Sequence, residues 1–215
     1  MRPGSAWLWT CALLGLGAAQ SDAHAQLPSE KTSEIIGWIA MSGDAGGLPF
    51  MVIDKVGAEI FVYDRTGRFM GSTPALVGSA RGDHEVVGIG DRELSDIKPS
   101  ERTTPAGRFV ARIRPSLGLG RVLWIDIPGA VALHPVIFNH PEENRVERLR
   151  SPEPGDNRIT YGCINISPMF YENVVRPLFA GTGVVYIVPE KRPLASTFPG
   201  YARARRAGLT PGGSP

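Results

Sequence analysis

The sequence has very little cysteine, since Cys11 and Cys163 are the only two in its 215 residues. Cys11 lies in a segment with the pattern of a secretory signal peptide: a basic start, an apolar run over residues 6–18, and a small-x-small site that ends at Ala25. We therefore predict that residues 1–25 are removed and that Cys163 is the only cysteine of the mature chain.

A single cysteine excludes an internal disulfide, which is the usual role of cysteine in an exported protein. Three interpretations of Cys163 remain open: a buried inert thiol, an intermolecular disulfide, or a reactive nucleophile. The residues around Cys163 must decide between them.

Long apolar runs are lacking after the signal peptide. No second stretch of about 18 apolar residues follows, so we predict no integral membrane segment in the mature chain and a periplasmic or secreted location. The chain also lacks an excess of either charge, with 23 basic and 21 acidic residues. This balance gives no reason to expect a nucleic-acid partner.

Short metal-ligand spacings and internal repeats are absent from the sequence as well. The scattered histidines and carboxylates match no common metal-binding pattern, so we predict no metal and no cofactor. The chain length after cleavage suits one domain with a substantial core. The sequence leaves the oligomeric state open.

Most of the mature sequence has the pattern of β-strands. Runs rich in β-branched and aromatic residues alternate with turn residues, which is typical of a meander of hairpins. The expected strands cover residues 49–55, 58–64, 68–78, 107–113, 121–127, 130–138 and 183–188.

One segment, 167–181, predicts a helix. Its apolar residues recur at helical spacing from Tyr171 to Phe179. Ser167 suits the N-cap and Gly181 the stop, while Pro177 should bend or shorten the helix. The expected fold is therefore mainly β, a sandwich or barrel with one or two helices.

The two ends of the mature chain lack a clear pattern. We interpret residues 26–47 as an N-terminal linker or edge segment. Residues 190–215 are rich in Arg, Gly and Pro, and we interpret them as a disordered or loosely docked tail.

Cys163 lies in the segment "RITYGCINIS" (158–167), where the chain passes from a strand toward the expected helix. Acyl transfer by a thiol needs a thiolate, a base, and N–H donors for the oxyanion. Gly162 permits unusual backbone angles beside the thiol. The backbone amides of Tyr161, Gly162 and Cys163 are therefore candidates for an oxyanion hole.

A histidine is the expected base, because imidazole titrates near neutral pH. After the signal peptide the chain offers His84, His134 and His140. His84 and His140 lie in polar loop sequence. His134 lies in an apolar strand, where a histidine also commonly has a purely structural role with a hydrogen-bond partner.

Taken together, "TTPAGRF" (103–109), the histidine of "ALHPV" and "ITYGCINI" resemble the L,D-transpeptidase catalytic domain, also called YkuD-like. The resemblance covers residues 48–189. In that family a strand histidine precedes a Ser/Thr-His-Gly-Cys motif, which an aliphatic residue and then Arg or Asn follow. His134 matches the upstream histidine, and the residues that match the motif are Thr160, Gly162, Cys163, Ile164 and Asn165.

Two departures from the family pattern stand out. Tyr161 replaces the motif histidine, and it retains the backbone N–H without the charge of an imidazole. His134 precedes Cys163 by 29 positions (163 minus 134), which is more than the family's usual gap. The excess, the inserted segment (139–158), is charged and rich in proline, and it is either a wall or lid of the site or surface decoration. Pro135 still offers the carbonyl with which the family orients its histidine.

The resemblance implies a cysteine acyltransferase that acts on peptidoglycan stem peptides and makes 3-3 crosslinks through a thioester, with Cys163 as nucleophile and His134 as base. Tyr161, Gly162 and Pro135 would shape the site or its oxyanion hole. Arg158, Thr160 and Asn165 would bind substrate, although a structural role for them is equally open. Two alternatives are a hydrolase of the same fold and a catalytically silent wall-binding domain with a buried thiol.

Overall fold

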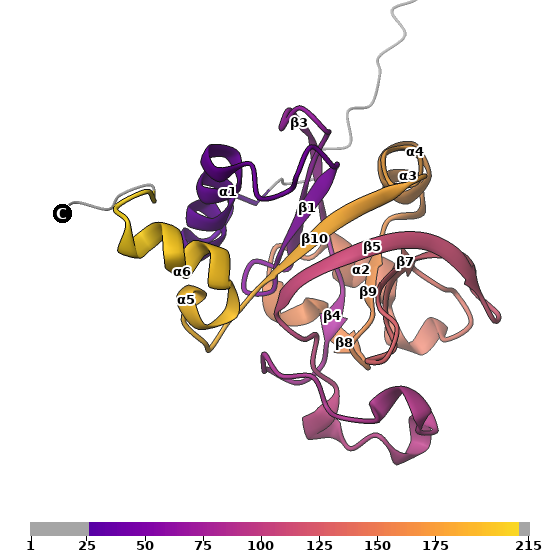
Figure 1. The fold of residues 1–215 in the computed structure, drawn as a ribbon. Coiled ribbons are helices and arrows are strands. Elements are labelled where there is room, and N and C mark those ends of the chain that lie inside the picture. The colour runs from indigo at the N-terminus through magenta and orange to yellow at the C-terminus, as the bar shows by residue number, and fades with distance from the viewer. Residues whose placement is uncertain (1–25, 211–215) are drawn as a thin grey trace, which may run out of the picture.

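The structure, a computed structural model, describes residues 26–210 (Figure 1). The expected signal peptide (1–25) and residues 211–215, the end of the expected tail, lie outside the described residues. The chain is mainly β, as the sequence predicts. Its strands are β1 (Phe50–Asp54), β2 (Glu59–Tyr63), β3 (Phe69–Pro74), β4 (Val77–Gly78), β5 (Gly107–Ser116), β6 (Gly120–Asp126), β7 (Val131–Pro135), β8 (Arg158–Thr160), β9 (Ile164–Ile166) and β10 (Thr182–Val188).

Eight strands form one sheet in the order β3-β2-β1-β10-β5-β6-β7-β9, and β4 pairs with β8 beside it. Neighbours are antiparallel except for β1 with β10 and β7 with β9. Leu76, just after β3, exchanges two backbone hydrogen bonds with Asn165 of β9, with N···O distances of 2.8 and 3.0 Å. This bridge links the two edges, so the sheet curls into a nearly closed barrel.

A helical segment fills one face of the curled sheet. It consists of α3 (Pro168–Phe170), the π-helical turn η6 (Tyr171–Val175) and α4 (Arg176–Leu178), and it confirms the helix expected over 167–181. Tyr171, Val175 and Phe179 are buried against the sheet. The π-turn comes just before Pro177, which has no N–H for the regular helical hydrogen bond.

Further helices cover the other face of β1 and β10. The N-terminal helix α1 (Glu30–Ser42) and the C-terminal helices α5 (Leu194–Thr197) and α6 (Pro199–Arg206) lie side by side there (Figure 1). The rings of Trp38 in α1 and Tyr201 in α6 meet edge to face, with 6.0 Å between their centroids. Both aromatic side chains are almost fully buried.

These helices correct the expectations for both ends of the chain. Residues 26–47 contain α1 and are not a linker, because Ile35, Trp38 and Ile39 form one apolar stripe against the sheet. Residues 190–210 are not a loose tail, because Phe198 and Tyr201 anchor them. On the exposed side of α6 lie the arginines that suggested disorder, Arg203, Arg205 and Arg206.

Two irregular segments precede and follow the strands β5, β6 and β7 in the chain. The first, residues 79–106, contains the short 3-10 helices η1 (Ile89–Asp91), η2 (Leu94–Asp96) and η3 (Pro99–Glu101). The second is the inserted segment (139–158), with η4 (Pro141–Glu143), α2 (Arg145–Arg150) and η5 (Pro154–Asn157). Within residues 26–210, no helix combines the length and apolar character required to cross a membrane.

Candidate active site

The parallel pairing of β7 with β9 brings His134 next to the segment that follows Cys163. In this register His134 lies opposite Asn165, and 3.0 Å separates His134 Nε2 from Asn165 Nδ2. Cys163 lies two residues before Asn165 and directly precedes β9. The residue predicted as base therefore lies in β7, and the predicted nucleophile lies at the start of the segment that pairs with β7.

The thiol of Cys163 is partly buried and donates to the carbonyl of Ala130, with an Sγ···O distance of 3.5 Å. Ala130 lies in the turn between β6 and β7 and has a φ of 51°, a left-handed conformation that costs an alanine about 1 kcal/mol. Burial raises the pKa of Cys163, although a backbone hydrogen bond with Ala132 and the charge of Arg145 act in the opposite direction. The thiol is therefore neutral at neutral pH.

The imidazole of His134 is also neutral. The side chain is only 5% exposed, and its Nδ1 lies 2.8 Å from the carbonyl oxygen of Pro135. Burial lowers the pKa of His134; the hydrogen bond with Pro135 opposes this shift, and the charge of Arg145 adds to it. The Pro135 carbonyl thus contacts the imidazole at Nδ1 and leaves Nε2 to Asn165.

Thr160 shapes the turn that carries the cysteine. Its hydroxyl donates to the carbonyl of Cys163 (2.6 Å) and accepts from the backbone N–H of Gly162 (3.1 Å). The Gly162 amide therefore already has an acceptor, which corrects its expected place in an oxyanion hole. Thr160 is buried, so it supports the loop and does not face a substrate. The amides of Tyr161 and Cys163 remain candidates for the hole.

The segment "TTPAGRF" (103–109) supports this turn through hydrogen bonds of Thr104. The hydroxyl of Thr104 donates to the Gly162 carbonyl and accepts from the Gly78 amide, both at 2.9 Å. Gly162 has a φ of +135°, and a Cβ at this position would lie 2.8 Å from the carbonyl oxygen of Thr103. Only glycine fits here without a shift of the backbone.

Tyr161 contacts the 79–106 segment. Its ring lies under the guanidinium of Arg102, with 4.0 Å between Cζ and the ring centroid, a cation–π contact. The ring also lines a narrow pocket together with Gly129, Val131, Thr103 and, from the loop, Glu85, Val86 and Glu101. Gly129 and Val131, which line this pocket, flank Ala130 in the chain, and the Ala130 carbonyl accepts from the thiol.

Arg158, expected to bind substrate, is part of a buried ionic cluster. Its guanidinium donates to Glu190 (2.7 Å) and to the carbonyl of Lys55 (2.8 Å). Lys55 is 1% exposed and pairs with Asp83 at 2.8 Å. Burial raises the pKa of Asp83, but hydrogen bonds from Lys55 and from the Arg192 and Glu190 amides outweigh it and lower the pKa to about 2. Arg158 therefore ties β8 to the start of the C-terminal region.

Asn165, the third expected substrate-binding residue, is almost fully buried. Its amide contacts His134 on one side and the guanidinium of Arg145 on the other. Arg145 comes from the inserted segment (139–158), and sequence reasoning did not single it out. The only signal was its position in a charged insertion between the two motif residues.

The other two histidines lie apart from this site. His140 is exposed and pairs with Glu142 at 3.2 Å, and His84 is exposed in the 79–106 segment. Residues 26–210 contain no group of three or more His, Cys, Asp or Glu side chains that could hold a metal ion.

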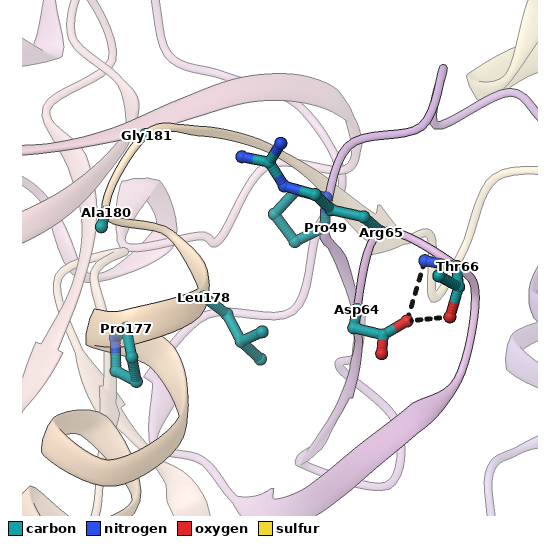
Figure 2. Close-up of a pocket in the computed structure, with 8 residues that line it drawn as sticks. All are labelled: Pro49, Asp64, Arg65, Thr66, Pro177, Leu178, Ala180 and Gly181. Atoms are coloured by element: carbon teal, nitrogen blue, oxygen red, sulfur yellow. Dashed lines mark hydrogen bonds between the residues drawn. The ribbon is translucent and has the colours of Figure 1, made fainter.

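A surface depression at another place contains none of these residues. It lies between the β2–β3 turn and the end of α4, where Leu178 faces Asp64, Arg65 and Thr66 (Figure 2). The Asp64 carboxylate accepts from the Thr66 amide and hydroxyl at 2.8 and 2.7 Å. Because this carboxylate already has hydrogen-bond partners within its own turn, we infer no catalytic role for the depression.

The comparisons with known proteins add nothing to these observations, since no family model and no curated protein matches the chain.

Proposed function

We infer that the chain is an exported cysteine acyltransferase of the L,D-transpeptidase type that acts on peptidoglycan stem peptides in the periplasm. The observation that carries this proposal is the β7–β9 register, which sets His134 opposite Asn165, two residues along the chain from Cys163. The Thr160–Gly162 turn supports it, because a rigid loop can present a thiol and a backbone amide together.

In the proposed reaction, Cys163 attacks the carbonyl that joins the third residue of a stem peptide to its terminal D-alanine. His134 Nε2 takes the thiol proton and then protonates the leaving amine, so D-alanine departs and a thioester remains. The amine of a second stem attacks the thioester, gives a 3-3 crosslink and restores the thiol.

The free site must change before this attack. Its thiol and imidazole are neutral, and the Nε2 atom of His134 faces the Asn165 amide. A bound substrate that excludes water and offers its carbonyl to the Tyr161 and Cys163 amides would favour proton transfer from the thiol to the imidazole.

The same neutral pair is the observation that favours the alternative of a silent wall-binding domain. In that case Cys163 is only a partly buried thiol and His134 a structural residue of β7. A hydrolase of the same fold, with water in place of the second amine, is the other alternative, and it differs only in the second half of the reaction.

The test is incubation of the purified protein with tetrapeptide muropeptides, followed by mass spectrometry. We expect a crosslinked dimer and free D-alanine from the wild type, and neither from Cys163→Ala or His134→Ala. His140→Ala is the matched control, since this histidine is exposed and pairs only with Glu142. Tripeptide without dimer would indicate the hydrolase, and no product from any form would contradict the proposal.

A further inference from the structure

The inserted segment (139–158) contributes one side chain to the candidate site. Arg145, the first residue of α2, donates through Nη1 to Asn165 Oδ1 and pairs through Nε with Glu143 at 2.5 Å. Its side chain is only 11% exposed. The guanidinium is therefore held in place between the insertion and β9.

This contact determines how the Asn165 amide is oriented. A guanidinium has only donors, so the amide must turn its oxygen to Arg145 and its nitrogen to His134. The amide nitrogen is itself only a donor, so His134 Nε2, 3.0 Å away, must accept. The imidazole proton then lies on Nδ1 and points to the Pro135 carbonyl at 2.8 Å. The linked side chains of Arg145, Asn165 and His134 thus leave the basic lone pair of the imidazole on Nε2.

We propose that Arg145 is a positioning residue of the Cys163–His134 site: it fixes the Asn165 amide, and through it the proton of His134, and it holds a positive charge against Asn165, two residues along the chain from Cys163. The inference rests on the proposed function in one respect, that Cys163 is the reactive group. According to this proposal, the inserted segment (139–158) is part of the active site and not only surface decoration.

The charge has a defined effect on both groups. A positive charge favours the thiolate and disfavours the imidazolium, and Arg145 accordingly lowers the pKa of both Cys163 and His134. Three carboxyl groups lie near Arg145 or near the turn whose carbonyl accepts from the thiol. Glu143 pairs with Arg145, and the Glu85 and Asp126 carboxyls lie against Gly129, next to the Ala130 turn.

The test compares Arg145→Met with Arg148→Met. Arg148 lies on the same helix, but it donates only to the carbonyls of Glu143 and Asp156, so its loss loosens the insertion without changing the charge at the site. Two titrations are recorded over about pH 4–11.5, because the Cys163 pKa is raised and the His134 pKa is lowered: the rate at which iodoacetamide alkylates the peptide that contains Cys163, and the NMR shift of the His134 ring.

We expect both midpoints to rise by about one pH unit in Arg145→Met, a typical effect of one neighbouring charge. Both should stay at the wild-type values in Arg148→Met. Arg145→Lys retains the charge and should show a smaller rise. Arg145→Gln is the second neutral variant, which keeps the test valid if Arg145→Met does not fold.

A rate that changes by the same factor at every pH in Arg145→Met, with unmoved midpoints, would overturn the inference and leave Arg145 a structural residue. The titration of His134 needs no reaction at Cys163. If the wild-type thiol stays unreactive throughout the range, the proposed function fails, and the His134 midpoint alone decides the role of Arg145.

Discussion

Glu59 is a buried carboxyl whose titration should make the stability of this protein depend on pH. It is the first residue of β2, is 1% exposed, and its Oε1 has no hydrogen-bond partner among the described residues. Burial raises the pKa of Glu59 from 4.5 to about 7; a hydrogen bond with Ser72 opposes the shift, and the charge of Asp54 adds to it. We expect Glu59→Gln to remove this pH dependence.

The direction of the pH dependence follows from the pKa of Glu59, which is higher in the folded protein than in the unfolded chain. Between about pH 4.5 and 7 the folded protein keeps the Glu59 proton while the unfolded chain has lost it, so the free energy of unfolding falls as the pH rises. Above pH 7 the loss is complete and amounts to at most about 3 kcal/mol. Below pH 4.5 both states are protonated and the loss vanishes.

Urea unfolding of the wild type and Glu59→Gln at pH 5 and pH 8 measures this effect. The stability of the variant relative to the wild type should rise by about 2 kcal/mol between the two pH values. Any constant cost of the amide cancels in this comparison. Glu172→Gln, at an exposed ion pair, is the control and should show a change near zero. A relative stability of Glu59→Gln that is the same at both pH values would refute the argument.

Three further substitutions test the account. Gly162→Ala should reduce the alkylation rate of Cys163 at least tenfold, because its Cβ would lie 2.8 Å from a backbone oxygen; an unchanged rate would contradict the proposed shape of the turn. Thr104→Val should lower the free energy of unfolding by about 1–3 kcal/mol, measured in urea, because two buried backbone groups lose their partner; a neutral result would mean that they find other partners. Tyr201→Ala should cost about 3–5 kcal/mol in the same assay, and a loss below 1 kcal/mol would show that α6 is not part of the cooperative fold.

The sequence predicts the strands well where consecutive residues have a high preference for β-structure. The runs 49–55 and 58–64 are β-branched and aromatic, and they become β1 and β2 with little shift of their ends. The helix over 167–181 is also predicted, because its apolar spacing and its stop signal are local. Its π-turn is not predicted, since it depends on how Pro177 is accommodated.

The terminal helices show why composition can mislead. α1 is only 13 residues long, and its apolar stripe, formed by Ile35, Trp38 and Ile39, is not recognised as a helical pattern in the sequence. α6 contains three arginines, and its stability comes from Tyr201 and the preceding Phe198, which pack on residues far away in the sequence. Such long-range packing leaves almost no local pattern.

The candidate site also contains some residues that the sequence predicts and others whose roles only the fold reveals. Cys163 and His134 are predicted because thiol and imidazole chemistry limits the choices to few residues. The sequence leaves a structural role for Thr160 and Arg158 open, but it does not predict their partners, such as Glu190, which only the fold brings near. Arg145 is missed because an inserted segment gives no register from which to place its side chains.

The most direct test of the central claim is the state of Cys163 during turnover. The protein is incubated with a tetrapeptide stem, quenched in acid and digested, and the peptide that contains Cys163 is weighed by mass spectrometry. The account predicts a Cys163 peptide that carries the tripeptide acyl group as a thioester, together with released D-alanine, and no adduct in Cys163→Ala. An unmodified Cys163, or D-alanine release that persists in Cys163→Ala, would contradict it.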